Sequence, residues 1–228
     1  MAIKIWSNKH VGVYLSRSRP QDKSANIKTG DMAQTSILAL ADTPSSIYKS
    51  GRDGQICGTC PLRSKTAGGN GGCYVNPSWQ NGIWHSGNES PGEMPRPNSI
   101  AKPVRIGAYG DPAKMPVSVV RALAQAGRGW TGYTHAWRTA AKTMKQYLMA
   151  SCDSARERAR AKKDGWRTFR IAPPGPVRVL EGETLCPNTT HKIQCSKCLL
   201  CSGTAGRGKT DIVIEAHGSH VSAFGENK

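Results

Sequence analysis

The sequence predicts an α/β fold, arranged as a parallel sheet or a partial (β/α) barrel, with cysteine-rich metal-binding loops. From about residue 101, short apolar runs alternate with helical segments, as they do in successive β-α-β units. In addition, seven of the eight cysteines fall into two tight groups with the spacing of metal ligands. We expect residues 1–180 to form the partial barrel and residues 181–228 to form a C-terminal cysteine-cluster segment that includes the last strand.

The regular elements are expected in a definite order. An apolar run over residues 32–41 predicts a buried strand. Gly, Pro, Asn and Ser dominate residues 51–100, which predicts a long loop that a metal cluster would anchor. Beyond this loop we expect helices over residues 117–126, 139–146 and 155–164, and strands over residues 103–109, 130–136, 147–151, 166–172, 177–180 and 211–217.

Polar residues gather where the predicted strands end. Active residues in parallel α/β folds lie at the carboxyl ends of strands, so this set marks a candidate catalytic rim. The candidate catalytic residues are Tyr109, Asp111, His135, Arg170 and His217. Asp153 also follows a predicted strand, and either Asp153 or Ser154 would cap the next helix.

The first cysteine group comprises Cys57, Cys60 and Cys73, in the spacing C-x2-C-x12-C. Thiolates two residues apart can reach one metal centre, and three thiolates leave a fourth coordination position to be filled. Two interpretations follow. The group either holds zinc, completed by a histidine such as His85, or a [4Fe–4S] cluster whose fourth iron is open to a small molecule.

The second cysteine group has the spacing C-x8-C-x2-C-x2-C and comprises Cys186, Cys195, Cys198 and Cys201. Four thiolates close a shell around zinc or a [4Fe–4S] cluster, and the crowded CxxCxxC favours the cluster. Disulfides are the alternative, but in a reducing compartment this spacing favours metal. Cys152 stands alone in an apolar run, so we interpret it as a small core residue.

The chain is strongly basic. Lys and Arg total 32 against 15 acidic residues, a net charge of +17, which attracts polyanions such as nucleic acid. No apolar run approaches the roughly 18 residues of a membrane span or the length of a signal peptide, so we expect a cytoplasmic protein without a membrane partner. The segment GTAGRGKT (203–210) fits the phosphate-loop pattern, but a predicted strand follows it where a helix is required. We interpret it as a basic connector.

One segment resembles a known family. GAYGDPAKMP looks like the strand-end GGEP motif of radical S-adenosylmethionine (radical SAM) enzymes, with Gly110, Asp111 and Pro112 at its G-E-P positions. In that family the motif follows a cluster-binding loop of three cysteines and contacts the methionine amino group of S-adenosylmethionine. The order here is similar: a three-cysteine loop, the motif, β/α units and a C-terminal cysteine cluster. The family's ligand spacing is CxxxCxxC, and its acidic residue is Glu in place of Asp111.

Nearly the whole chain is also similar to a group of radical-SAM-like proteins common in bacteriophages and mobile elements. This similarity is carried by SANIKTG (24–30), by Cys73 followed by Tyr74, and by the strand signatures IGAYGDP, GYTHAW and GWRTFR. The resemblance implies one or two [4Fe–4S] clusters and S-adenosylmethionine bound by Gly110, Asp111 and Pro112. It also implies a location in the bacterial host cell if the protein is phage-encoded.

Two functions are expected. The first is a radical-SAM-type enzyme with one open cluster and one auxiliary cluster, which takes electrons from a donor and acts on a nucleic acid or nucleotide. The alternative is a non-catalytic nucleic-acid-binding protein with structural metal sites, zinc or iron–sulfur. An open coordination position and a response to S-adenosylmethionine separate the two.

Overall fold

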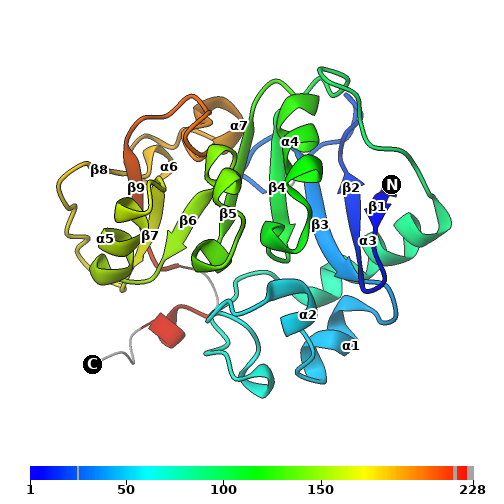
Figure 1. The fold of residues 1–228 in the computed structure, drawn as a ribbon, viewed down its shortest axis with the longest axis horizontal. Coiled ribbons are helices and arrows are strands. Elements are labelled where there is room, and N and C mark those ends of the chain that lie inside the picture. The colour runs from blue at the N-terminus through cyan, green and yellow to red at the C-terminus, as the bar shows by residue number, and fades with distance from the viewer. Residues whose placement is uncertain (25, 218–219, 225–228) are drawn as a thin grey trace.

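The chain folds around one mixed β-sheet with helices on both faces (Figure 1). The computed structural model describes residues 1–24, 26–217 and 220–224. Within these residues the sheet has nine strands in the order β1-β2-β3-β4-β5-β6-β7-β9-β8. The predicted α/β class with a largely parallel sheet is therefore confirmed.

A hairpin that the sequence analysis missed forms one edge of the sheet. Strands β1 (Ala2–Ser7) and β2 (Val11–Ser16) pair antiparallel, and β2 pairs antiparallel with β3 (Ala33–Ala39). Every residue of β2 is buried, because the strand is covered on both faces.

From β3 onward every pairing is parallel. The chain passes through β4 (Val104–Tyr109), β5 (Trp130–Thr134), β6 (Met149–Cys152) and β7 (Thr168–Ala172), and the far edge consists of β9 (Asp211–Glu215) and β8 (Glu183–Leu185). The strands expected at 32–41, 103–109, 130–136, 147–151, 166–172 and 211–217 are thus present, with ends that differ from the prediction by at most two residues. The carboxyl ends of these strands meet along one edge of the sheet.

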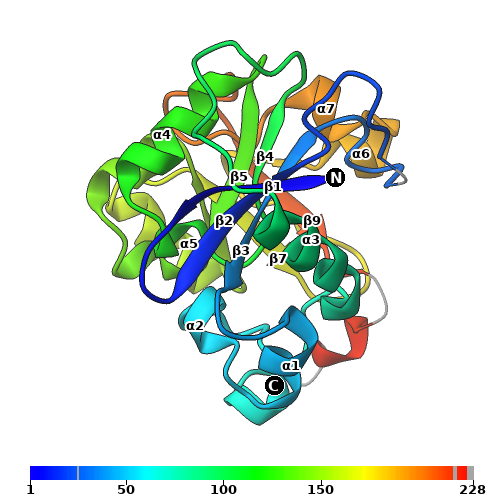
Figure 2. The ribbon, with the colours of Figure 1, turned by 90° about the vertical axis from the view of Figure 1, so that its right-hand side faces the viewer.

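The two faces of the sheet are covered by different parts of the chain. In Figure 2, helices α4 (Val117–Ala126) and α5 (Ala155–Lys163) lie on one side. Helices α3 (Pro77–Glu89), α6 (Pro187–His191) and α7 (Cys195–Cys198) lie on the other. Helix α4 buries Val119, Val120, Leu123 and Ala124, the spacing of one apolar face of a helix.

The long loop predicted over residues 51–100 is wrong in part, because it contains helices. Helix α1 (Pro44–Lys49) precedes it, and α2 (Gly54–Cys57) and α3 lie within it. Asn76 caps α3 by accepting a hydrogen bond from the Ser78 N–H at 2.9 Å, and Pro77 occupies the first turn. Helix α3 approaches β2 so closely that a Cβ on Gly87 would lie 2.3 Å from the Tyr14 ring. The helix depends on this close approach and shows little apolar periodicity.

Two further expectations are corrected. The helix expected over 139–146 is a 3-10 helix, Lys142–Gln146, and another 3-10 helix, Ala136–Arg138, precedes it. The strand expected over 177–180 is absent from the described residues, and the edge strand is β8, a few residues later. None of the helices in the described part of the chain is long and apolar enough to cross a membrane.

Candidate functional site

All seven grouped cysteines line one cavity of about 650 Å³. The sheet forms its floor: alternate residues of successive strands face it, which is the period of one face of a sheet. These floor residues are Arg105, Gly107 and Tyr109 of β4, Thr131 and Tyr133 of β5, Ser151 of β6, Phe169 and Ile171 of β7, and Ile212 and Ile214 of β9. The volume is that of a small-molecule site.

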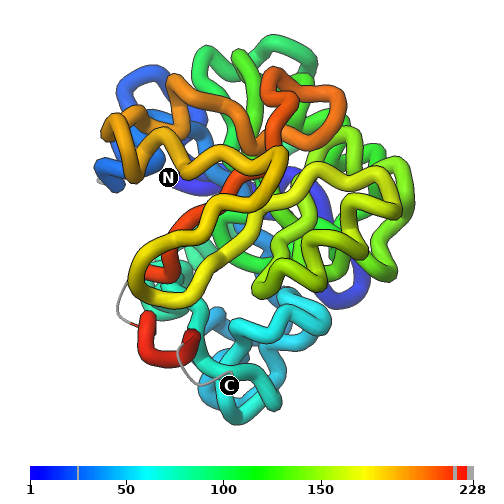
Figure 3. The backbone as a smooth tube through the Cα atoms, turned by 90° about the vertical axis from the view of Figure 1, so that its left-hand side faces the viewer, coloured from blue at the N-terminus to red at the C-terminus, as the bar shows by residue number. Residues whose placement is uncertain are grey.

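The two cysteine groups approach this cavity from different segments. Figure 3 shows the cyan segment that carries the first group at one end of the molecule and the orange segment that carries the second group at the other. All eight cysteines are free thiols, so the disulfide alternative finds no support in the structure. Across residues 1–24, 26–217 and 220–224, however, no three Cys, His, Asp or Glu side chains converge closely enough to hold a single ion.

The first cysteine group encloses polar atoms that lack partners. Beside the main cavity, Cys57, Cys60, Cys73 and Tyr109 line a small void of about 20 Å³, together with Tyr48, Asp53, Leu62 and Arg63. In this void, Asp53 Oδ1 and Tyr109 Oη are buried without a hydrogen-bond partner among the described residues. The other oxygen of Asp53 accepts a hydrogen bond from the Ser64 N–H at 2.9 Å and so fixes the loop. Burial raises the pKa of Cys57 well above its ordinary value and that of Cys73 to about 11.

The second cysteine group is tied to the segment that carries the SANIKTG motif. The Cys195 N–H donates to Lys28 O at 3.0 Å, and the Ser196 N–H donates to Thr29 O at 3.0 Å. Gly30 has φ +66°, and a Cβ there would lie 2.5 Å from Ser196 Oγ, so the contact requires glycine. Burial raises the pKa of Cys201 to about 12, although a hydrogen bond with Tyr133 lowers it.

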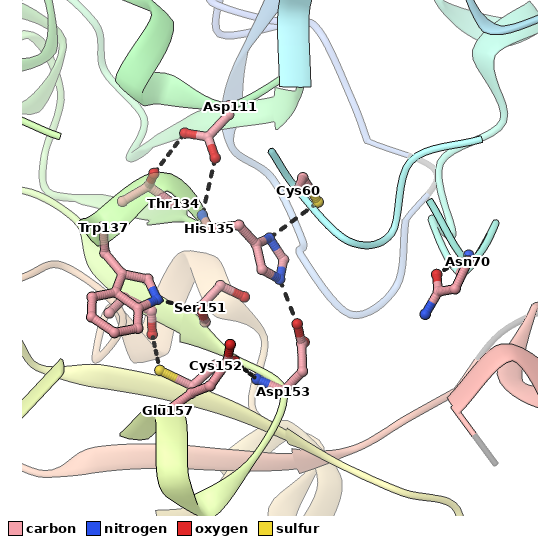
Figure 4. Close-up of polar contacts among 12 residues, drawn as sticks. Cys60, Asn70, Asp111, Thr134, His135, Trp137, Ser151, Cys152, Asp153 and Glu157 are labelled. Atoms are coloured by element: carbon pink, nitrogen blue, oxygen red, sulfur yellow. Dashed lines mark hydrogen bonds and ion pairs between the residues drawn. The ribbon is translucent and has the colours of Figure 1, made fainter. Parts of the chain in front are cut away.

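His135 connects the first cysteine group to the end of β6 (Figure 4). Its Nδ1 lies 3.3 Å from Cys60 Sγ, and its Nε2 lies 3.4 Å from Asp153 Oδ1. Burial lowers the pKa of His135, but hydrogen bonds and charge from Asp153 and Cys60 outweigh it and hold the pKa well above 6.5. His85, the histidine that the sequence suggested, is exposed on α3.

Asp111 lines the cavity, and its carboxylate is fully engaged (Figure 4). Oδ1 accepts hydrogen bonds from Ala113 N at 2.9 Å and Thr134 Oγ1 at 2.7 Å, and Oδ2 accepts from His135 N at 3.0 Å and Ala136 N at 3.3 Å. A carboxylate has about four acceptor sites, so these four donors use them all. Asp111 thus fixes the turn that positions His135.

The residues on either side of Asp111 allow the backbone to lie close to β3. Gly110 lines the cavity with φ +78°, and a Cβ there would lie 2.5 Å from Ile37 O on β3. Pro112 is buried in the first turn of the 3-10 helix Pro112–Lys114. The backbone of residues 110–112 therefore passes close to the carboxyl end of β3.

Of the other predicted catalytic residues, two line the cavity and one does not. Tyr109 and His217 line the cavity, and His217 is exposed. Arg170 is buried on the opposite face of β7, since its neighbours Phe169 and Ile171 face the cavity. There it forms an ion pair with Glu183 at 2.7 Å. The rim therefore brings Tyr109, Asp111, His135 and His217 to one site and leaves Arg170 in a structural network.

Several cavity residues escaped the sequence analysis. Arg105 faces the cavity from β4 and hydrogen-bonds the Tyr74 hydroxyl. The rings of Tyr133 and Phe169 pack at 4.4 Å between centroids on the cavity floor. Arg105, Gly107 and Tyr109 alternate along one strand and so share a face of the sheet, and this spacing could have predicted that Arg105 lies at the site.

The chain matches no family model, no curated protein and no solved structure. The site's chemistry therefore has to be argued from its own residues.

Proposed function

We propose that this protein is an iron–sulfur enzyme of the radical SAM type that acts on a nucleic acid or nucleotide. In this proposal the first cysteine group holds a [4Fe–4S] cluster that binds S-adenosylmethionine, and the second group holds an auxiliary cluster. The observation that carries the proposal is that all seven grouped cysteines line a single cavity above the parallel sheet. In a purely structural role, the two groups would have no reason to face a common space.

The residues fit iron–sulfur clusters. Three and four free thiols supply the soft ligands that iron–sulfur clusters take. The thiols border one cavity of about 650 Å³, which offers room for polynuclear clusters. The unpartnered Asp53 and Tyr109 oxygens beside the first group suit a bound group that brings its own donors.

When bound, the first cluster would supply the electron that cleaves S-adenosylmethionine into an organic radical. The chain's own contribution is binding, orientation and exclusion of water. Gly110 lets the backbone pass close to Ile37 of β3 at the cavity, and the cavity offers a concave space in which a ligand can be oriented. An external electron donor is a required partner.

The cavity also suits the proposed substrate class. Tyr133 and Phe169 offer aromatic faces on which a base can stack. The side chains of Arg105, Lys28 and His217 can donate hydrogen bonds to phosphate. The net charge of +17 would draw a polyanion toward the molecule. In the same proposal, the parallel run from β3 to β9 is the wall of an open (β/α) barrel, with the cavity on its inner side.

The test is reductive cleavage of S-adenosylmethionine. Anaerobically reconstituted protein is mixed with dithionite and S-adenosylmethionine, and 5′-deoxyadenosine and methionine are quantified. Wild type and the control Cys152→Ala, whose thiol lies outside both groups, should form both products, whereas Cys57→Ala should form neither. If wild type carries both clusters and still forms no product, the radical SAM assignment is wrong.

A non-catalytic nucleic-acid-binding protein is the second candidate, favoured by the charge and by exposed aromatic side chains. Trp79 is 79% exposed and Tyr74 54% exposed, and exposed rings provide stacking surfaces for single-stranded bases. Such a protein would bind oligonucleotides with steep salt dependence and would not respond to S-adenosylmethionine. A binding series at increasing salt, with and without S-adenosylmethionine, distinguishes the two candidates.

A further inference from the structure

His135 is held in place at three points around the first cysteine group. Its backbone N–H donates to Asp111 Oδ2 at 3.0 Å, and its Nε2 lies 3.4 Å from Asp153 Oδ1. Its Nδ1 lies 3.3 Å from Cys60 Sγ, and the side chain is 14% exposed (Figure 4). The ring therefore presents one nitrogen to the cavity at the edge of the thiol group.

The backbone of Asp153, behind the ring, is itself anchored. The Asp153 N–H donates to Glu157 Oε2 at 2.8 Å, and the other oxygen of Glu157 pairs with Arg138. Histidines that bind metals almost always donate their second ring N–H to a carboxylate, a backbone carbonyl or water, which fixes the tautomer and the ring orientation. The pair formed by His135 and Asp153 has this arrangement, with Nδ1 left to face the thiols.

Two other polar side chains of the main cavity, Asp111 and His217, are weaker candidates. Asp111 uses its acceptor sites on four internal donors. His217 is exposed, and its Nδ1 lies 2.9 Å from Glu215 O. His135 is largely shielded from solvent and already contacts a thiol of the first group, so it is placed to enter the ligand shell with a small movement.

We propose that His135 is a ligand, through Nδ1, of the metal centre that the first cysteine group binds. The inference rests on the proposed function, since it requires iron at Cys57, Cys60 and Cys73. It adds that the coordination position left by three cysteines is closed by the protein at rest. S-adenosylmethionine must then displace His135 from iron, and Asp153 sets how firmly the imidazole is held. The exchange is of ligands alone, without transfer of electrons.

The test is pulsed electron paramagnetic resonance of the reduced, anaerobically reconstituted full chain, with ¹⁴N- or ¹⁵N-labelled histidine. The signal of the first centre is the one that Cys57→Ala removes. We expect the coupling of a directly bound nitrogen in wild type and in the control His85→Ala, an exposed histidine on α3, and its loss in His135→Ala. Isotope labelling of wild type alone reveals the coupling, so the test does not depend on a variant that folds.

Binding provides the second measurement. Without the competing imidazole, His135→Ala should bind S-adenosylmethionine about tenfold more tightly, because a resting state that is mostly closed lowers the apparent affinity in proportion. Asp153→Asn should keep the nitrogen coupling and give an intermediate affinity. An iron signal without histidine coupling in wild type overturns this inference and leaves the proposed function standing. Iron content that is equal in wild type and Cys57→Ala overturns the proposed function and this inference with it.

Discussion

Replacing Asp111 with alanine tests whether this carboxylate acts mainly to stabilise the fold. In the native chain it accepts hydrogen bonds from Ala113 N, Thr134 Oγ1, His135 N and Ala136 N, and it is 6% exposed. Ala136 N would keep a second acceptor, Thr134 Oγ1 at 3.0 Å. Three donors would be left without a partner, of which Thr134 Oγ1 is buried and the other two are partly buried.

The magnitude follows from those three donors. Each buried donor left unsatisfied costs about 1–3 kcal/mol, and water that enters the space left by the carboxylate recovers part of the sum. We expect Asp111→Ala to lower the free energy of unfolding by about 4 kcal/mol. For a chain of this size, about 2–4 °C of melting temperature is lost per kcal/mol, so the expected decrease in Tm is about 8–16 °C.

Thermal unfolding followed by circular dichroism measures this decrease, with Asp164→Ala as the control because Asp164 is exposed at the end of α5. The control should stay within about 2 °C of wild type. An Asp111→Ala variant with the Tm of the control and no binding of S-adenosylmethionine would refute the structural argument. It would instead give Asp111 the ligand-binding role that the family resemblance implies.

Three more outcomes are expected. Glu183→Gln should destabilise the chain by about 3 kcal/mol at pH 7, because it removes the buried charge that pairs with Arg170 at 2.7 Å. Burial raises the pKa of Glu183, but hydrogen bonds and charge from Arg170 outweigh burial and lower the pKa overall. The stability that the charged carboxylate contributes is therefore present above its ordinary pKa of 4.5. The gap in urea midpoint between wild type and variant should therefore shrink as the pH falls below 4.5 through the lowered folded pKa, and a gap that is constant with pH would contradict this. Cys198→Ala should lose the iron of one cluster by metal analysis while Cys152→Ala keeps both, and equal iron in the two variants would remove the second cysteine group from the ligands. Gly110→Ala should lower Tm by roughly 4–8 °C or more, because a left-handed φ of +78° and a carbonyl 2.5 Å from the new Cβ both oppose it; an unchanged Tm would contradict that reasoning.

Local signals in the sequence predicted the parallel strands well. Apolar runs bounded by polar residues marked β3, β4 and β6, and the apolar spacing of residues 117–126 marked α4. By contrast, the hairpin of β1 and β2 lacked a recognised turn signal, and α3 packs on β2 through a close contact of Gly87 with Tyr14. Such a contact joins residues far apart in the sequence, so local pattern does not reveal it.

The site was predicted by residue type but not by geometry. The sequence placed Arg170 on the catalytic rim, but a shift of one residue along a strand moves a side chain to the other face, and Arg170 pairs with Glu183 there. It suggested His85 for the first cysteine group, whereas the fold brings His135 to Cys60 across 75 positions of sequence. That both cysteine groups line one cavity depends on the whole sheet, which no spacing encodes.

The central claim is that both cysteine groups hold iron–sulfur clusters on one cavity. Iron and acid-labile sulfide content of the anaerobically reconstituted chain tests it most directly. We expect about eight irons and about eight sulfides per chain, two [4Fe–4S] clusters in all. Zinc without sulfide at either cysteine group would contradict it.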